Sequence, residues 1–417
     1  MSCWRRRAGC RGPAPLCRLG LASLLVLALI GGGAAAGEVP IRMGLAGPPR
    51  NLDPRLATDA TSERVNRLLY RRLTTFDAES LPAPELARWE ALSPTHYRFT
   101  LGEEGRDFSD GSRLTSADVK ATFDSVRDPA TASPHRATLA IITAITTEGP
   151  DRLDFHLREP DPLFPAYLGM GILPAALIQS GHPFAVAPVG SGPLRFETWP
   201  QPGRLVLRRQ RDGQILELLA VKDPNVRVMK LLRGEIDLLQ NDLSPELIGY
   251  LRGREEVRVA RAPGVNFSYL GFNLEDPVTG LPQVRQALAH AIDRDEILRY
   301  LLQGDGRLAT GLFPPEHWAA SPDLAPLVFD PERARALLAE VGYGPDRPLR
   351  LSYKTSSDPF RIRFATIIQA QLARVGIEAR IQSYDWGTFF GDIKAGRFQL
   401  YGLTWVGIRT PDIFRYV

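Results

Sequence analysis

The side chains most able to do chemistry in this sequence are its six histidines, and their spacing argues against a metal site. No two of them stand at a separation that would bring both imidazoles to one ion, and the chain has no H-E-x-x-H segment. His156 alternates within a strand-like stretch, and His290 falls in a helical pattern. We therefore expect structural histidines, with no metal and no cofactor.

Two other short patterns could suit catalysis. Asp107 and Asp110 could serve as the acid and base of a glycosidase, and the stretch 190–193 (GSGP) holds a serine between glycines. However, Asp110-Gly111 is a hairpin-turn pair in its own right, and the glycine-rich stretch lacks the lysine and the helix of a phosphate loop. The chain also has no G-x-S-x-G elbow. We predict turns at both places and no enzyme active site.

The first 36 residues have the plan of a secretory leader. Five arginines and no acid flank the apolar stretch Leu19–Ile30, and small residues follow it. We predict export of the chain and cleavage between Ala36 and Gly37. An uncleaved anchor is the alternative, although the apolar stretch is shorter than the roughly 20 residues of a membrane span. Cys17 precedes the apolar stretch, so we do not expect a lipoprotein.

Removal of this leader changes the composition of the chain. Lys+Arg fall from 51 to 46 against 47 Asp+Glu, so the formal net charge goes from +4 to about −1, which gives no electrostatic support for a nucleic-acid partner. All three cysteines leave with the leader, so the remainder has no disulfide and no thiolate. Its length predicts two or more domains.

The positions of strands and helices follow from local signals. In residues 215–239, Asp223 and Pro224 suit the start of a helix and Gly234 its end, with an apolar run on either side. This length predicts two parallel strands joined by a right-handed crossover.

Residues 330–384 repeat the alternation of helix and strand. Asp330 and Pro331 start a helix, a strand begins near Leu349, and a second helix and a strand from Ile377 follow. Residues 76–190 instead predict a smaller α+β lobe. We therefore expect an α/β protein with an inserted small domain.

Six segments in this order resemble the family-5 extracellular solute-binding proteins of ABC importers, whose members bind oligopeptides, dipeptides or nickel. The resemblance covers nearly the whole chain after the leader. The matching segments are 51–77 (NLDPRLATDATSERVNRLLYRRLTTFD), 83–126 (APELARWEALSPTHYRFTLGEEGRDFSDGSRLTSADVKATFDSV), 187–199 (APVGSGPLRFETW), 231–239 (LLRGEIDLL), 272–297 (FNL…VRQALAHAIDRDEI) and 368–381 (IQAQLARVGIEARI).

The resemblance implies a periplasmic-binding-protein-like fold of the second type, with two lobes, two hinge strands and an extra inserted domain. We expect the chain to run on beyond Val417. The implied divisions are a signal peptide 1–36, lobe I at 37–75 plus 186–264 completed by 406–417, a small domain 76–185, lobe II at 265–405, and hinge strands near 266–274 and 399–405.

The family also implies a mechanism and partners. A peptide or other small solute would favour closure of the two lobes and would be delivered to an inner-membrane ABC permease. The receptor is expected to be monomeric and to have no enzyme activity. A ligand-sensing receptor of a signalling system is the alternative function, and a secreted hydrolase is a further one.

The resemblance points to two segments for solute contact. Thr58, Asp59 and Ala60 match a strand that contacts the peptide backbone, and the segment 405–409 matches the one that holds a peptide's α-amine. The residues implied in this second segment are Trp405, Gly407, Ile408 and Arg409.

This second segment departs from the pattern of peptide-binding members, which have an acid three residues after the tryptophan. Here Ile408 stands in that place and cannot pair with an ammonium, whereas Arg409 suits a carboxylate or phosphate. Trp405 either stacks on solute or fills the hinge, Arg409 is either a ligand or an exposed loop residue, and Asp59 is a possible substitute for the amine anchor. We expect free dipeptides to bind worse than anionic or amine-blocked solutes.

Overall fold

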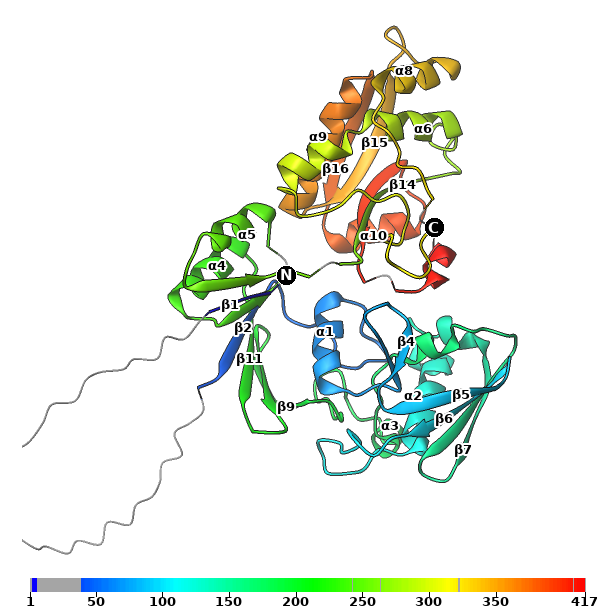
Figure 1. The fold of residues 1–417 in the computed structure, drawn as a ribbon, viewed down its shortest axis with the longest axis vertical. Helices are drawn as coiled ribbons and strands as arrows, with labels where there is room; N and C mark the ends of the chain where they lie inside the picture. Colours follow the sequence, from blue (N-terminus) through cyan, green and yellow to red (C-terminus); the bar gives the residue numbers. More distant parts are fainter. Residues whose placement is uncertain are drawn as a thin grey trace, which may run out of the picture. The chain divides into compact units, whose positions relative to one another are not determined.

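The computed structural model describes residues 2–5, 39–241, 243–262, 264–321, 323–407 and 409–416. The chain divides into two compact units, drawn in Figure 1. The first comprises residues 1–75, 83–243 and 247–261, and the second comprises residues 76–82, 244–246 and 262–417.

A seven-stranded sheet organises one part of the first unit (Figure 1), in the order β13-β1-β12-β2-β11-β10-β9. Its strands are β1 (Ser2–Arg5), β2 (Ile41–Leu45), β9 (Leu194–Gln201), β10 (Arg204–Arg209), β11 (Ile215–Ala220), β12 (Leu238–Gln240) and β13 (Val257–Ala260). The helices α4 (Pro224–Arg233) and α5 (Pro245–Arg252) connect strands of this sheet.

The predicted strand–helix–strand unit is present, with one difference in pairing. Asp223 caps α4 by accepting hydrogen bonds from two backbone N–H groups, and Gly234 ends the helix at φ 72°. The flanking strands β11 and β12 run parallel as expected, but each pairs with β2, which lies between them. Local signals indicate the direction of a strand, whereas its neighbours depend on segments distant in sequence.

The N-terminal strand β1 also differs from expectation. We expected residues 1–36 to stay outside the fold, yet Ser2–Arg5 pairs antiparallel with β12 on one side and β13 on the other. Both neighbours present unpaired edge groups that an extended segment can satisfy. Residues 6–38, which hold the predicted apolar stretch and cleavage point, lie outside the described residues.

The smaller α+β part of the first unit is built on the sheet β5-β6-β8-β7. Phe99, Phe123, Phe155 and Phe164 are fully buried there, and their rings meet mostly edge to face. The elements of this part and its surroundings are α1 (Ala60–Leu69), β3 (Thr74–Phe76), β4 (Pro82–Pro84), β5 (Ala87–Ser93), β6 (His96–Leu101), α2 (Ser116–Arg127), η1 (Pro129–Thr131), η2 (Thr138–Ile141), β7 (Ile142–Glu148), β8 (Arg152–Leu157), η3 (Phe164–Leu168) and α3 (Ala175–Gln179).

The loop between β6 and α2 folds around the buried Arg106. Its Nε donates to the carbonyl of Leu114 at 2.8 Å, and its Nη1 lies 2.6 Å from a carboxylate oxygen of Asp151. Asp110 accepts hydrogen bonds from both the backbone N–H and the hydroxyl of Ser112, and Gly111 has φ 88°. The predicted turn is confirmed, and the Asp110 carboxylate serves to build it.

The glycine-rich stretch 190–193 leads into β9, as predicted. A Cβ on Gly190 would lie 2.2 Å from the carbonyl oxygen of Leu69, and one on Gly192 would lie 2.4 Å from its carbonyl carbon. These glycines therefore let the chain pass directly against the end of α1.

The second unit contains a four-stranded sheet in the order β14-β17-β15-β16, with α8 and α9 following the pattern expected for residues 330–384 (Figure 1). β15 and β16 pair in parallel over eight residues. The elements are β14 (Phe267–Phe272), α6 (Pro282–Ala291), α7 (Arg294–Glu296), a turn of π-helix η4 (Ile297–Leu301), α8 (Pro331–Glu340), β15 (Leu349–Ser356), α9 (Pro359–Ala373), β16 (Ile377–Tyr384), α10 (Trp386–Lys394), β17 (Leu400–Trp405) and η5 (Pro411–Tyr416).

Residues 406–416 group with the second unit, where Ile413 packs against Phe313. That this segment completes lobe I stays a prediction. The two expected hinge strands, β14 and β17, pair antiparallel with each other inside the same sheet. This pairing keeps the chain after β17 beside the segment that precedes α8.

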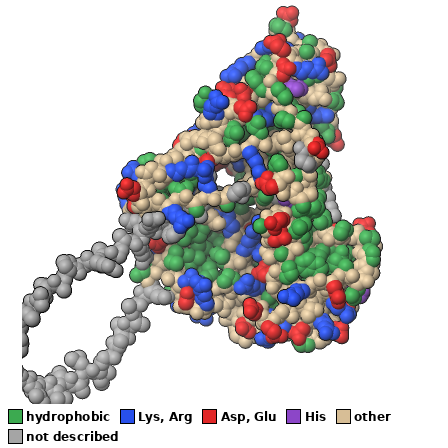
Figure 2. Space-filling view, viewed as in Figure 1, with side chains coloured by type: hydrophobic (Ala, Val, Ile, Leu, Met, Phe, Trp, Pro, Cys, Tyr) green, Lys and Arg blue, Asp and Glu red, His purple; other side chains and the backbone are tan. Residues whose placement is uncertain are grey.

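Two further features are the charge of the surface and the apolar character of the helices. Basic and acidic side chains are interspersed on the face shown in Figure 2. Within the described ranges, no helix has both the length and the apolar character needed to cross a membrane.

Candidate functional site

The first candidate segment, Thr58–Ala60, forms the entry to α1. Asp59 is the cap of this helix, since its carboxylate accepts from the backbone N–H of Ser62 at 2.9 Å and from the Ser62 hydroxyl at 2.5 Å. Thr58 and Ala60 are exposed on either side. The Asp59 carboxylate thus has a structural task, which the sequence interpretation as an amine anchor did not include.

A set of buried contacts holds the residues just before this entry. Asp53 and Arg55 form an ion pair at 2.7 Å, with both side chains largely buried. The Ser133 hydroxyl donates to the Arg55 carbonyl at 2.6 Å, and His135 Nε2 lies 3.1 Å from the Ala57 carbonyl oxygen. These contacts fix the backbone that leads into Thr58.

Glu63 is a candidate that the sequence interpretation missed. It stands one helical turn after Asp59, on the same side of α1. Burial raises the pKa of its carboxyl, and the nearby charges of His135 and two arginines only partly oppose this effect. A half-buried carboxyl with a raised pKa beside an exposed helix entry is typical of a binding site. The i,i+4 spacing from Asp59 was the available signal in the sequence.

The second candidate segment begins at Trp405, the last residue of β17. The Trp405 ring belongs to an array of aromatic rings from β14 and β17. Trp405 stacks on Tyr269 with ring centroids 6.3 Å apart, and Tyr269 stacks on Phe267 at 6.0 Å. Tyr401 meets Tyr269 edge to face. Burial raises the pKa of the Tyr269 hydroxyl, and its hydrogen bond with Tyr401 adds to the rise. The Trp405 ring is partly exposed, so it can both pack in this array and offer a face to a solute.

Contacts of the backbone position the loop after Trp405. Gly407 has φ 71°, and its N–H donates to the side-chain oxygen of Asn266 at 3.1 Å. The Arg409 carbonyl oxygen lies 3.0 Å from His317 Nε2. Because His317 Nδ1 accepts from the N–H of Ala319, Nε2 carries the proton and donates. Ile408 lies outside the described residues.

The Arg409 side chain is partly exposed and lies over an aromatic ring. Its guanidinium carbon is 5.4 Å from the centroid of Phe76, which also belongs to the second unit. Such a cation–π contact orients the guanidinium plane and engages none of its N–H donors. The donors of Arg409 therefore stay available to a carboxylate or phosphate.

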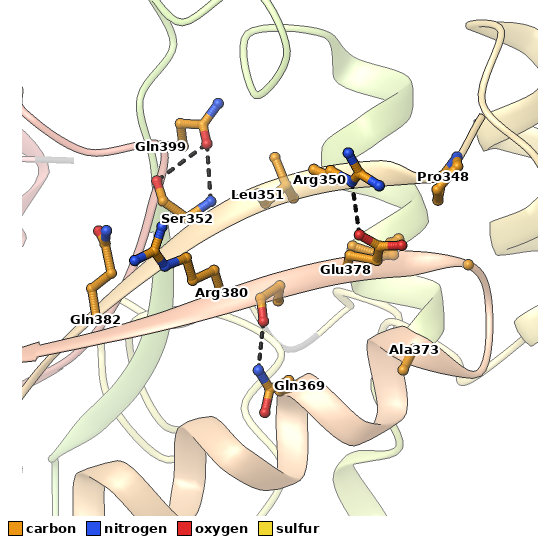
Figure 3. A pocket seen from close by; sticks show the side chains of 13 residues that line it. Pro348, Arg350, Leu351, Ser352, Gln369, Ala373, Glu378, Arg380, Gln382 and Gln399 are labelled. Atoms are coloured by element: carbon orange, nitrogen blue, oxygen red, sulfur yellow. Dashed lines mark hydrogen bonds and ion pairs between the residues drawn. The ribbon is translucent and has the colours of Figure 1, made fainter.

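A separate pocket of about 800 Å³ lies on the second unit, and none of the predicted site residues line it. Figure 3 shows its polar wall on β15 and β16, where Arg350 pairs with Glu378 at 2.8 Å and Gln399 accepts from Ser352. Arg380 projects from the same strands (Figure 3). The pocket is open to solvent and its ion pair is exposed. It is a different site from the one predicted for solute contact.

The described side chains do not form a metal site. Across the described part of the chain, no three histidine, cysteine, aspartate or glutamate side chains come together in a way that could hold a metal ion. The rings of His96 and His156 lie 4.3 Å apart between centroids and are tilted to each other, but their acidic neighbour Asp154 is engaged by Arg98 at 2.8 Å.

Comparisons with known proteins identify the family. Residues 54–416 match the bacterial extracellular solute-binding proteins, family 5. The chain is 26% identical to the dipeptide-binding protein of Escherichia coli K12 over 411 residues, which cover 88% of this chain and 76% of that protein. It is 29% identical to the glutathione-binding protein GsiB of Escherichia coli O1:K1 over 358 residues, covering 82% and 69%.

A solved structure supports the same assignment. The periplasmic binding protein DppA of Helicobacter pylori, in complex with the peptide STSA, is 25% identical and matches with a TM-score of 0.78 over 91% of this chain and 80% of that one. This likeness confirms the expected periplasmic-binding-protein fold of the second type. These relatives are substrate-binding proteins. The chain therefore belongs to family 5 of the bacterial extracellular solute-binding proteins.

Proposed function

We propose that this protein is the solute-binding receptor of an ABC importer, that it captures a peptide-like solute, and that it delivers the solute to a membrane permease. The family match over residues 54–416 is the observation that carries this role. Relatives named for dipeptides and for glutathione support a peptide-like solute. The receptor acts in the periplasm as a monomer, after cleavage of its leader between Ala36 and Gly37.

The solute contacts come from two segments. Thr58, Asp59 and Ala60 at the entry to α1 supply backbone and side-chain groups. In the other segment, Trp405, Gly407, Ile408 and Arg409 supply a ring face and a guanidinium. Arg409 is the specificity-determining residue of this set, because its free donors suit a planar carboxylate and would repel an ammonium.

The ligand preference follows from the charge at position 409. A solute with an exposed carboxylate, or a peptide with a blocked amine, binds better than a peptide whose recognition depends on its free α-amine. The acid that would hold such an amine is replaced by Ile408, and the Asp59 carboxylate is already used as a helix cap.

Calorimetry against one peptide in three forms tests this preference. The forms are the free dipeptide, its N-acetyl derivative and its C-terminal amide. We expect acetylation to preserve or improve binding and amidation to weaken it at least about tenfold. Tight binding that is lost on acetylation would show that the amine is the recognised group and would refute the proposal. Recovery of intact solute at one-to-one stoichiometry separates binding from hydrolysis.

The leader is tested on the exported protein. N-terminal sequencing of the receptor recovered from the periplasm should begin at Gly37. A first residue at position 1 would instead support the uncleaved anchor.

A further inference from the structure

Three arginines of the first unit line one hollow of about 590 Å³. Arg127 ends α2, Arg136 lies in the loop before η2, and Arg158 follows β8. The hollow lies at some distance in sequence from every residue proposed above for solute contact. We call it the tri-arginine pocket, and Ser133, Pro134, Ala137, Ala140 and Ile142 complete its wall.

Each of the three guanidinium groups is held in place by the protein itself. Arg127 donates to the Ile142 carbonyl at 2.7 Å, Arg136 Nε donates to the Arg127 carbonyl at 3.1 Å, and Arg158 donates to the Ala140 carbonyl at 2.9 Å. Side chains that are already ordered lose little conformational entropy when a ligand binds. The pocket is therefore preorganised.

Arg136 and Arg158 have more N–H donors than their hydrogen bonds to the protein engage. A guanidinium has five N–H donors. The described contacts engage only Nε of Arg136 and one terminal nitrogen of Arg158. The terminal nitrogens of Arg136, and Nε and Nη1 of Arg158, are left for a ligand.

Ion pairs engage only one of the three arginines in the part of the chain that the structure describes. Asp124 pairs with Arg127 at 3.0 Å, and it also pairs with Lys120 at 2.5 Å. Asp128, next in the chain after Arg127, caps η1 through the N–H of Ala130. Arg136 and Arg158 are thus held by carbonyl oxygens rather than by carboxylates.

We propose that the tri-arginine pocket binds a phosphate group. Guanidinium forks match phosphate oxygens in pairs, and three of them offer more N–H donors than a single carboxylate can accept. The hollow is larger than inorganic phosphate alone, so it takes a phosphate that carries a substituent, either on a soluble monoester or in a lipid headgroup. The residues that line this site are different from those proposed for solute contact.

The pocket has a structural link to the rest of the first unit. The hydroxyl of the wall residue Ser133 donates to the Arg55 carbonyl. His135, two residues further along the same loop, contacts the Ala57 carbonyl. The same loop therefore borders the phosphate site on one side and braces the entry to α1 on the other.

Titration calorimetry at low ionic strength with pyrophosphate and with glycerol 3-phosphate tests the site. Arg136→Gln and Arg158→Gln should each weaken binding at least about tenfold. Arg152→Gln is the matched control, because it removes the same charge from the same small sheet, at an exposed residue paired only loosely with Glu148 at 3.7 Å. We expect this control to bind like the wild type.

Several outcomes would overturn the proposal. Equal weakening by Arg152→Gln would indicate diffuse attraction to surface charge, and no binding by the folded wild type would exclude the site. Equal affinity for an acidic peptide such as tetraglutamate would indicate a general anion or protein contact. Circular dichroism checks the fold of each variant, and Arg136→Lys replaces Arg136→Gln if the latter fails to fold.

Co-sedimentation with phosphatidylglycerol vesicles distinguishes the two sources of phosphate. Vesicle binding that Arg136→Gln abolishes assigns a lipid headgroup. Binding of the soluble monoester without vesicle binding assigns a free phosphate compound. Both results support the site.

Discussion

Tyr401 lies directly against Gly271 across the β14–β17 pair. The two residues are register partners, and a Cβ built on Gly271 would come within 2.3 Å of the Tyr401 ring. No flexible side-chain end can move aside there, because the Tyr401 ring is itself packed edge to face against Tyr269 and Phe398. The absence of a side chain at position 271 is thus a condition for the aromatic array formed by Phe267, Tyr269, Tyr401 and Trp405.

Gly271→Ala should therefore destabilise the second unit by about 1–3 kcal/mol through overpacking. The measurement is the shift of the urea unfolding transition followed by tryptophan fluorescence. Gly391→Ala is the matched control: Gly391 lies inside α10 and its Cβ would meet nothing within 4 Å, so the variant should gain up to about 1 kcal/mol. Equal stability of the two variants would contradict the packing argument.

Two arginines of one loop should differ sharply in importance. Arg106→Ala removes the donor to the Leu114 carbonyl oxygen and the ion-pair partner of Asp151, and it should cost about 1.5–3 kcal/mol in the free energy of unfolding. Arg113 pairs with Glu103 at 2.5 Å, but both side chains are exposed, so Arg113→Ala should stay within about 0.5 kcal/mol of the wild type. Chemical denaturation of the two variants side by side makes the comparison.

The half-buried carboxyl of Glu63 predicts a specific pH dependence. Its pKa is raised in the folded protein, so the native state binds the proton more tightly than the unfolded chain. Stability should then fall as pH rises from below the ordinary glutamate pKa, about 4.3, through the higher folded pKa, and stay level above it.

Glu63→Gln should remove this loss. The variant should be more stable than the wild type at pH 7 and equal to it below about pH 4, in thermal unfolding measured across that range. A constant difference at all pH values would mean that packing, and not ionisation, distinguishes the two proteins.

Two substitutions at Asp59 separate its roles as helix cap and as amine anchor. Asn caps a helix about as well as Asp, whereas Ala loses the cap at a cost of about 0.5–2 kcal/mol. We expect Asp59→Asn to keep both stability and solute affinity, and Asp59→Ala to lower stability. A tenfold or greater loss of affinity for a free-amine peptide in Asp59→Asn would instead establish Asp59 as the anchor.

Arg409→Gln should weaken binding of a carboxylate-bearing solute by about 10- to 100-fold, the loss expected for a hydrogen bond to a charged group. Calorimetry with the N-acetyl dipeptide gives the affinity. The control Arg380→Gln removes the same charge from the open pocket on β15 and β16 and should leave the affinity unchanged. Weaker binding in Arg380→Gln with unchanged binding in Arg409→Gln would show that the solute binds in the pocket on β15 and β16.

Much of the local structure could be predicted from short segments. Asp223 with Pro224, and Asp330 with Pro331, start helices where expected, because a cap and the first turn depend on neighbours in sequence. The turn at Asp110-Gly111 follows from the same kind of signal. The family resemblance, carried by ordered motifs along the chain, was likewise available in the sequence.

The tertiary structure alone decided how these pieces combine. The place of β2 between β11 and β12, the pairing of Ser2–Arg5 and the packing of Ile413 in the second unit all join residues far apart in the chain. The burial of Glu63 and the meeting of Arg127, Arg136 and Arg158 at one hollow have the same origin. A sequence pattern determines which face of an element is apolar, but the partner of that face, and so the pKa and charge of a site, depends on contacts that only the folded chain brings about.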